Sequence, residues 1–229
     1  MLRLEDVHVR QGSFELSLSL DIPKGARVAL MGASGSGKST VLSVVAGFTW
    51  PDSGTVWIDG VDVSRAAVSK HPISILFQDG NLFPHLTVFQ NVALGIEPSL
   101  KLRADDQKRV GEALDKVGLH GFGTRKPAEL SGGQQSRVAL ARMLLQDRPL
   151  VLLDEPFAAL DPGLRRDMLE LVARLCAETG QTLIMATHDL RDAERLCDRV
   201  LLLEDGRVAL EGSLSEAIAH QAEALRPWM

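Results

Sequence analysis

The chain has 229 residues, 45% hydrophobic and 24% charged, which fits one compact domain with a substantial core. Lys and Arg number 25 against 30 Asp and Glu, a net charge of −5 without any basic block, and this composition disfavours a nucleic-acid binder. Charges interrupt every apolar stretch well short of about 18 residues and no signal-peptide pattern begins the chain, so we expect neither a membrane span nor secretion.

The first part of the chain reads as strands separated by turns. Apolar and polar residues alternate over 14–22, which predicts a half-buried strand. Residues 27–31 form a short apolar strand that runs into a glycine-rich loop and then a helical pattern. Further strands are predicted at 55–58 and 73–77, each bounded by Gly, Pro or Asp.

The middle of the chain has a different texture. Between 79 and 130 the strand runs disappear, and helical patterns cover 87–94 and 104–117, broken by Gly and Pro. This pattern predicts a helical lobe inserted into an α/β core.

The last part returns to strand and helix in alternation. Apolar strands at 151–153 and 182–187 flank a helical segment with one apolar face. This alternation predicts an α/β fold with a largely parallel sheet, buried on both faces. Cys176 and Cys197 lie in helical patterns without nearby His partners, and we expect them to serve packing only.

The loop after the strand at 27–31 has the pattern G-x-x-x-x-G-K-S/T, between a strand and a helix, as phosphate binding requires. Glycines let backbone N–H groups face a ligand, and the following helix adds partial positive charge. The predicted nucleotide-binding residues are Gly32, Ala33, Ser34, Gly35, Ser36, Gly37, Lys38, Ser39 and Thr40. We expect Lys38 to contact the β and γ phosphates and Ser39 to bind Mg²⁺.

Two carboxylates, Asp154 and Glu155, follow an apolar strand and emerge at the carboxyl edge of the sheet, where α/β ligands bind. A solvated strand end explains one acid better than two. Because successive strand residues point in opposite directions, we expect Asp154 to face the metal and Glu155 to act as general base on the attacking water. His188 reaches the same edge, to hold the γ-phosphate or to align Glu155.

A second candidate anion site precedes the helical stretch that ends near residue 146. Ser131 is a natural N-cap, and Gly132 and Gly133 leave backbone N–H groups bare. An ordinary capped helix also explains this segment taken alone. A second phosphate-binding helix start about 100 residues after the first nevertheless suggests that two chains share two nucleotides.

The sequence resembles the ATP-binding subunits of ABC transporters along essentially its whole length. The segments GASGSGKST, LSGGQ and VLLDEP, with Gln78, Asp161 and His188, occur in that family's order. The resemblance implies a P-loop NTPase core of the RecA type with an N-terminal antiparallel β subdomain. It places the nucleotide-binding core at 1–78 and 131–229 and a helical subdomain at 79–130.

The resemblance also implies how the site works. ATP and Mg²⁺ are the expected cofactors, with Gln78 contacting Mg²⁺ and the attacking water. Two subunits form a head-to-tail homodimer in which one caps the ATP bound by the other's Lys38 loop, and Asp161 couples the two sites. The residues expected to act across this dimer are Ser131, Gly132, Gly133, Gln134 and Asp161.

Within the family, the segments at 78–88 and 95–102 most resemble the ATPases of Gram-negative thiamine importers, as does the lack of a C-terminal regulatory domain. The implied function is an ATP-hydrolysing motor for uptake of thiamine and its phosphate esters, at the cytoplasmic face of the inner membrane. A membrane permease and a periplasmic solute-binding protein are the implied partners, and nucleic acid is not. We expect permease contact at 81–94, whose apolar residues divide between packing and docking: Leu82, Phe83, Leu86 and Phe89.

The chain departs from the family near its start, where members commonly stack adenine on an aromatic residue and this chain has Arg10 and Gln11. Phe14 is the expected substitute, with a cation–π contact from Arg10 as the alternative. Ser136 stands where the family often has Gln, which we expect to alter only the helix surface.

Three other functions remain open. The first is an ATPase for import of another small solute, the second is an export ATPase, and the third is a soluble ATPase of DNA repair or translation. The last predicts coiled-coil insertions, duplicated cassettes or basic surfaces, and the sequence has none of them.

Overall fold

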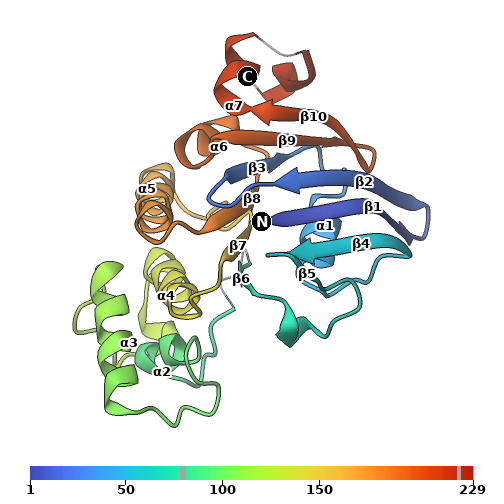
Figure 1. The fold of residues 1–229 in the computed structure, drawn as a ribbon. Coiled ribbons are helices and arrows are strands. Elements are labelled where there is room, and N and C mark those ends of the chain that lie inside the picture. The colour runs from blue at the N-terminus through green and yellow to red at the C-terminus, as the bar shows by residue number, and fades with distance from the viewer. Residues whose placement is uncertain (78–80, 221–222, 229) are drawn as a thin grey trace.

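The computed structural model describes residues 1–77, 81–220 and 223–228. An antiparallel sheet is formed by β1 (Leu2–Gln11), β2 (Phe14–Ile22), β4 (Ser53–Ile58) and β5 (Val61–Asp62). Its order is β2-β1-β4-β5 (Figure 1). The alternation predicted for 14–22 buries the Leu residues of β2 and exposes the residues between them or leaves them half-buried.

A larger mixed sheet forms the centre of the molecule. Its strands are β3 (Arg27–Met31), β6 (Ile73–Leu76), β7 (Leu150–Asp154), β8 (Thr182–Ala186), β9 (Arg199–Glu204) and β10 (Arg207–Ser213). The order is β10-β9-β3-β8-β7-β6, and every pairing is parallel except that of β10 with β9. The prediction of a largely parallel sheet is therefore confirmed.

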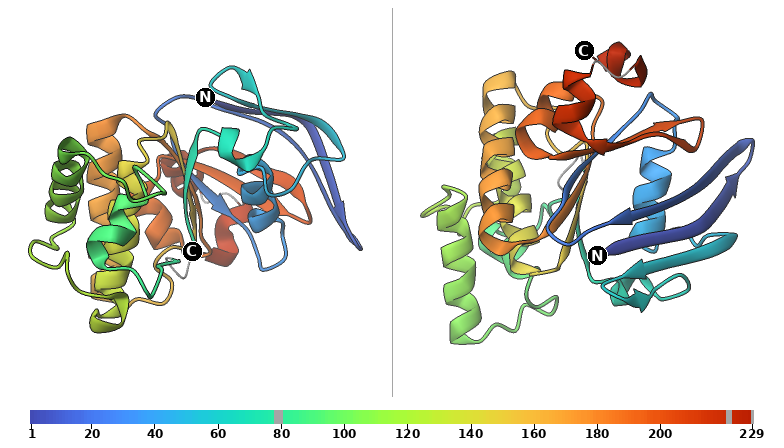
Figure 2. Two further views of the ribbon diagram at one scale, coloured as in Figure 1. Left: turned by 90° about the horizontal axis from the view of Figure 1, so that it is seen from below. Right: turned by 45° about the horizontal axis from the view of Figure 1, so that its top comes forward.

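Both faces of this sheet are buried, as predicted. In β3, Val28 and Leu30 face one core, and Ala29 and Met31 face the other. The first core lies between the two sheets and contains α1 (Lys38–Val45), as Figure 2 shows. Burial on both faces explains why these strands are apolar without interruption.

Helices cover the opposite face of the central sheet (Figure 1). They are α4 (Gly132–Leu145), α5 (Pro162–Thr179) and α6 (Leu190–Leu196). Cys176 and Cys197 are buried in this core without forming a disulfide, and burial raises the pKa of the Cys176 thiol to about 11. The thiol of Cys176 is therefore protonated at neutral pH, as a packing residue should be.

Two further helices, α2 (Val88–Ala93) and α3 (Ala104–Lys116), pack against α4 on the side away from the antiparallel sheet (Figure 1). Their bounds match the predicted helices to within one residue at each end, and Thr87 caps α2. The remaining elements are α7 (Leu214–Ala219) and the 3-10 turns Val68–Lys70, Pro127–Glu129 and Glu223–Trp228. Among the helices of the described residues, none has the length and apolar character to cross a membrane.

Candidate functional site

A cavity of about 640 Å³ opens where β3 ends and the chain enters α1. Three parts of the chain line it: the β1–β2 turn, the glycine-rich loop, and the segments that follow β7 and β8. The lining residues are Gln11, Phe14, Ser34, Gly35, Gly37, Lys38, Ser39, Thr40, Glu155 and His188. The fold therefore brings the predicted phosphate loop together with two predicted catalytic residues.

Glycine is required at two positions of the loop. Gly32 has φ +148°, and a Cβ there would overlap the Ser36 hydroxyl and the carbonyl of Leu203. Gly37 has φ +108° and precedes α1, and a Cβ there would lie 2.8 Å from Cζ of Phe14. At both positions the backbone has a conformation that favours glycine and lies too close to neighbouring atoms for a side chain. Gly37 and other residues of the loop line the cavity.

Lys38 begins α1 and is buried at the base of the loop. Its Nζ donates hydrogen bonds to the carbonyl oxygens of Gly32, at 2.8 Å, and Ala33, at 2.9 Å. Burial lowers the pKa of Lys38, while the charges of Glu155 and Asp154 act in the opposite direction. The loop thus holds a positive charge beside the cavity.

The acidic pair differs from its predicted geometry. The strand β7 ends at Asp154, and Glu155 has a left-handed backbone with φ +43°, so strand alternation does not reach it. Strand alternation was predicted to point the two carboxylates in opposite directions, and this reason was wrong, because the chain turns at Glu155. Such a conformation is unfavourable for Glu and is typical of functional sites.

Glu155 and His188 meet at the cavity wall. The Glu155 N–H donates to the carbonyl of Ala186 at the end of β8, which joins the two strand ends. Nδ1 of His188 lies 3.2 Å from Oε2 of Glu155. A carboxylate and an imidazole in contact beside a phosphate loop can accept and pass a proton.

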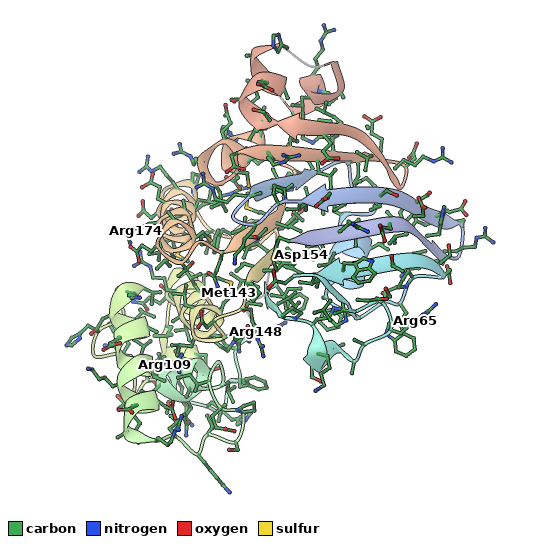
Figure 3. The ribbon with its side chains drawn as sticks, viewed as in Figure 1. Arg65, Arg109, Met143, Arg148, Asp154 and Arg174 are labelled. Atoms are coloured by element: carbon green, nitrogen blue, oxygen red, sulfur yellow. The ribbon has the colours of Figure 1, made fainter. Side chains whose placement is uncertain are left out.

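Asp154 lies at the end of β7, near the middle of the view in Figure 3. Burial raises the pKa of its carboxyl, the negative charge of Glu155 raises it further, and Lys38 opposes both effects. Ser39 is exposed in the cavity at the start of α1. Ser39 lines the cavity together with Glu155, whereas Asp154, the preceding residue, does not line it. Hydroxyl and carboxylate oxygens are the kind of ligand that Mg²⁺ prefers, so these side chains fit the ion chemically. Gln78, the third predicted metal residue, lies outside the described residues.

Ser131 caps α4 as predicted. Its hydroxyl accepts a hydrogen bond from the N–H of Gln134 at 3.3 Å, and the Gln134 side chain accepts one from the N–H of Ser131 at 3.0 Å. Asp161 caps α5 in the same manner, through the N–H of Leu164. Ser131 and Asp161 are exposed, and neither lines the cavity of its own chain. Their predicted role across a dimer stays a prediction.

The β1–β2 turn places two side chains at the cavity. Phe14 lines it, whereas Arg10 pairs with Glu15 at 3.0 Å and lines a separate surface hollow. Gln11, which was not among the predicted site residues, also lines the cavity. Gln11 pairs with Phe14 across the hairpin. Its place at the cavity could therefore have been inferred from the predicted position of Phe14 and the turn at Gly12.

The chain resembles known proteins along its full length. Residues 16–158 match the family described as ABC transporter. The thiamine import ATP-binding protein ThiQ of Jannaschia sp. (strain CCS1) is 70% identical, with all of both chains covered. The protein of the same name from Cereibacter sphaeroides is 48% identical, covering 100% of this chain and 99% of the relative.

Solved structures agree with this resemblance. The dimeric structure of the ATP-binding cassette MJ0796 in a post-hydrolysis state, bound to ADP and Pi, has a TM-score of 0.81 and 34% identity, covering 93% of this chain and 99% of that one. CbiO1 from Clostridium perfringens, part of the transporter complex cbiONQ, has a TM-score of 0.86 and 32% identity, covering 99% and 93%. With a P-loop NTPase fold and a family match over more than half its length, the chain belongs to the ABC transporter family.

Proposed function

We propose that the chain is the ATP-hydrolysing subunit of an importer of thiamine and its phosphate esters. The observation that carries this proposal is the 70% identity, over all 229 residues, to a thiamine import ATP-binding protein. The cavity that places the glycine-rich loop opposite Glu155 and His188 is the matching chemical feature.

In this proposal the triphosphate of ATP binds the backbone of residues 32–40. The N-terminus of α1 adds favourable partial charge. Lys38 gives up its hydrogen bonds to the carbonyl oxygens of Gly32 and Ala33 and donates to phosphate oxygens instead. The new hydrogen bonds replace those that are lost. Phe14 and Gln11 supply the part of the cavity that remains for the base.

Glu155 accepts the proton of the attacking water, and His188 keeps its carboxylate in position. The 3.2 Å contact uses Nδ1 of His188, which leaves Nε2 as the ring atom for a phosphate oxygen. Ser39 and Asp154 hold Mg²⁺, with Gln78 as the further ligand. When bound by these residues, the ion would supply positive charge against the phosphates.

We also propose that two copies act together. Solved dimers of MJ0796, at 34% identity, support a dimer of this chain. Ser131, Gly132, Gly133, Gln134 and Asp161 are then the residues that meet the partner's ATP. The exposure of Ser131 and Asp161, outside the cavity of their own chain, supports this assignment.

A permease is proposed to dock where the lobe at 79–130 meets the central sheet. A groove at this junction is lined by Phe48, Val68, Ser69, His71, Ile73, Ile75, Leu94, Gly95, Ile96, Pro98, Gln146 and Arg148. Phe48 is 51% exposed, although its ring stacks on that of Phe77. A large aromatic side chain beside a groove fits an apolar partner segment.

The residues predicted to divide between packing and docking differ in exposure. Leu82 and Phe89 pack on the core, and Leu86 is half-buried. Phe83 is 45% exposed, which leaves it available to a partner. The proposal further places the subunit at the cytoplasmic face of the inner membrane, with a periplasmic binding protein delivering thiamine to the permease.

The test is transport by the assembled complex in proteoliposomes. Thiamine should stimulate ATP hydrolysis and enter the vesicles, and Glu155→Gln should abolish both activities. Glu178→Gln, the same substitution at an exposed position near the end of α5, is the matched control. Normal uptake by Glu155→Gln contradicts the catalytic assignment, whereas stimulation by a different solute alone contradicts only thiamine as the substrate.

A further inference from the structure

A second, smaller cavity lies directly beside Glu155 and His188. The same cavity is lined by Arg165 and Asp192, which belong to α5 and α6. Neither of these two residues lines the nucleotide cavity. A pair of charged side chains therefore lines a cavity with Glu155 and His188 without lining the nucleotide cavity.

The charges of this second pair meet closely and are largely removed from water. Nε of Arg165 donates to Oδ2 of Asp192 at 2.6 Å, and Nη2 of Arg165 contacts the same oxygen. Nη1 lies 3.8 Å from Oδ2 of Asp189. The side chains of Arg165, Asp192 and Asp189 are 20%, 12% and 17% exposed. We expect this ion pair to stay in one geometry, because separating the two charges would leave each of them without a partner in a largely water-free site.

The two helices that this pair joins each begin at a catalytic segment. Arg165 lies one turn into α5, and its N–H donates to the carbonyl of Asp161, where the segment after Glu155 ends. Asp192 lies in the first turn of α6, which begins directly after Asp189, the neighbour of His188. Asp189 is itself held by its N–H, which donates to the hydroxyl of Thr187 at 3.1 Å.

The contact between Glu155 and His188 is more exposed to solvent than the contact between Arg165 and Asp192. The side chain of His188 is 58% exposed and that of Glu155 is 29% exposed. Exposed ion pairs are weak, and two side chains on loops hold a geometry only as well as the loops are held. The Arg165–Asp192 pair, which lines the small cavity with them, is less exposed than this contact.

We propose that Arg165, held by Asp192 and Asp189, is a positioning residue for ATP hydrolysis. It fixes the segment that carries Glu155 relative to the segment that carries His188. This inference rests on the proposed catalytic roles of these two residues.

The test compares substitutions of Arg165 in the assembled transporter. Arg165→Met should lower kcat for ATP hydrolysis by roughly 10- to 100-fold, the effect of a displacement of about 1 Å at a reacting group. KM for ATP should change by less than roughly threefold, because Arg165 touches no part of the nucleotide cavity. Arg165→Lys, which keeps the charge but loses the planar fork, should recover part of kcat.

A matched control joins the same two helices elsewhere. Arg195 of α6 lies 3.8 Å from Glu170 of α5, with side chains 45% and 62% exposed, and neither residue lines the small cavity. Arg195→Met should leave kcat unchanged. A loss of kcat in Arg195→Met as large as that in Arg165→Met overturns the proposal, because both pairs would then act only by joining the helices.

A double variant separates positioning from folding. Arg165→Met leaves Asp192 buried without its partner, whereas Arg165→Met with Asp192→Leu replaces the pair by apolar side chains and should restore thermal stability. Under the proposal kcat stays low in the double variant. Recovery of kcat together with stability overturns it.

The outcomes also distinguish this inference from the proposed function. If Glu155→Gln retains hydrolysis, the catalytic assignment fails, and the positioning role fails with it. If Glu155→Gln abolishes hydrolysis while stably folded Arg165→Met keeps its kcat, only the positioning role is wrong.

Discussion

Gly133 lies so close to Leu164 that a methyl group on Gly133 would overlap the end of the leucine side chain. Gly133 is in the first turn of α4, two residues after the N-cap Ser131. Leu164 is in the first turn of α5, and its N–H donates to the side chain of the N-cap Asp161. The two segments proposed to meet a partner's nucleotide are therefore in packing contact within one chain. A movement of one segment shifts the other, because there is no space between them.

Gly133→Ala should destabilise the chain by about 1–3 kcal/mol, because Leu164 has to leave its position. Equilibrium unfolding in denaturant measures this loss. Gly132→Ala is the matched control, since a Cβ at Gly132 meets no atom within 4 Å and the position is exposed. Adding Leu164→Ala to Gly133→Ala should remove most of the extra cost, and two additive losses would contradict the contact.

Lys38→Met should eliminate the stabilisation that ATP gives to the folded chain. A ligand at 100 times its Kd stabilises a protein by about 2.7 kcal/mol, so the melting temperature of the wild-type chain rises with ATP. The variant lacks the buried ammonium group that we propose contacts the phosphates, and its melting temperature should not respond. Lys24→Met, at an exposed position before β3, should respond like the wild type.

Asp154→Asn should stabilise the nucleotide-free chain at neutral pH. Burial and the charge of Glu155 raise the pKa of the Asp154 carboxyl above 3.8. A carboxyl with a raised folded-state pKa contributes less stability as pH rises through that pKa, so the advantage of the variant should grow from acid toward neutral pH. Melting temperatures across this range measure it, with Asp21→Asn, exposed on β2, as control. The same variant should lose ATP hydrolysis, since Asp154 is a proposed Mg²⁺ ligand.

Regular patterns made much of this fold predictable. Strands buried on both faces, such as β7 and β8, read as unbroken apolar runs, and Ser131 identified the start of α4 by its capping chemistry. The first strand, β1, was not predicted, because a bulge between Leu4 and Val7, with Asp6 at φ +46°, shifts its alternation by one residue.

The site was predictable only where local sequence fixes geometry. The glycine-rich loop and the two strand ends have such signals, and the cavity brings them together. The left-handed turn at Glu155 has none, because Glu rarely adopts it and tertiary contacts impose it. The pairing of Arg165 with Asp192 spans 27 residues between two helices, and no period in the sequence encodes such a contact.

Phe14→Ala should weaken ATP binding by about 1–3 kcal/mol, the usual value of a base stacked on an aromatic ring. Phe14 lines the cavity and its ring packs against Gly37, whereas Arg10 is paired with Glu15 at the surface. Calorimetric titration with ATP and with inorganic triphosphate separates the two roles of the ring: affinity should fall for ATP and stay nearly constant for the ligand that has no base. Loss of affinity for both ligands would mean that Phe14 acts by supporting the loop. Arg10→Ala should bind ATP like the wild type, and a large loss there would instead assign the base contact to Arg10.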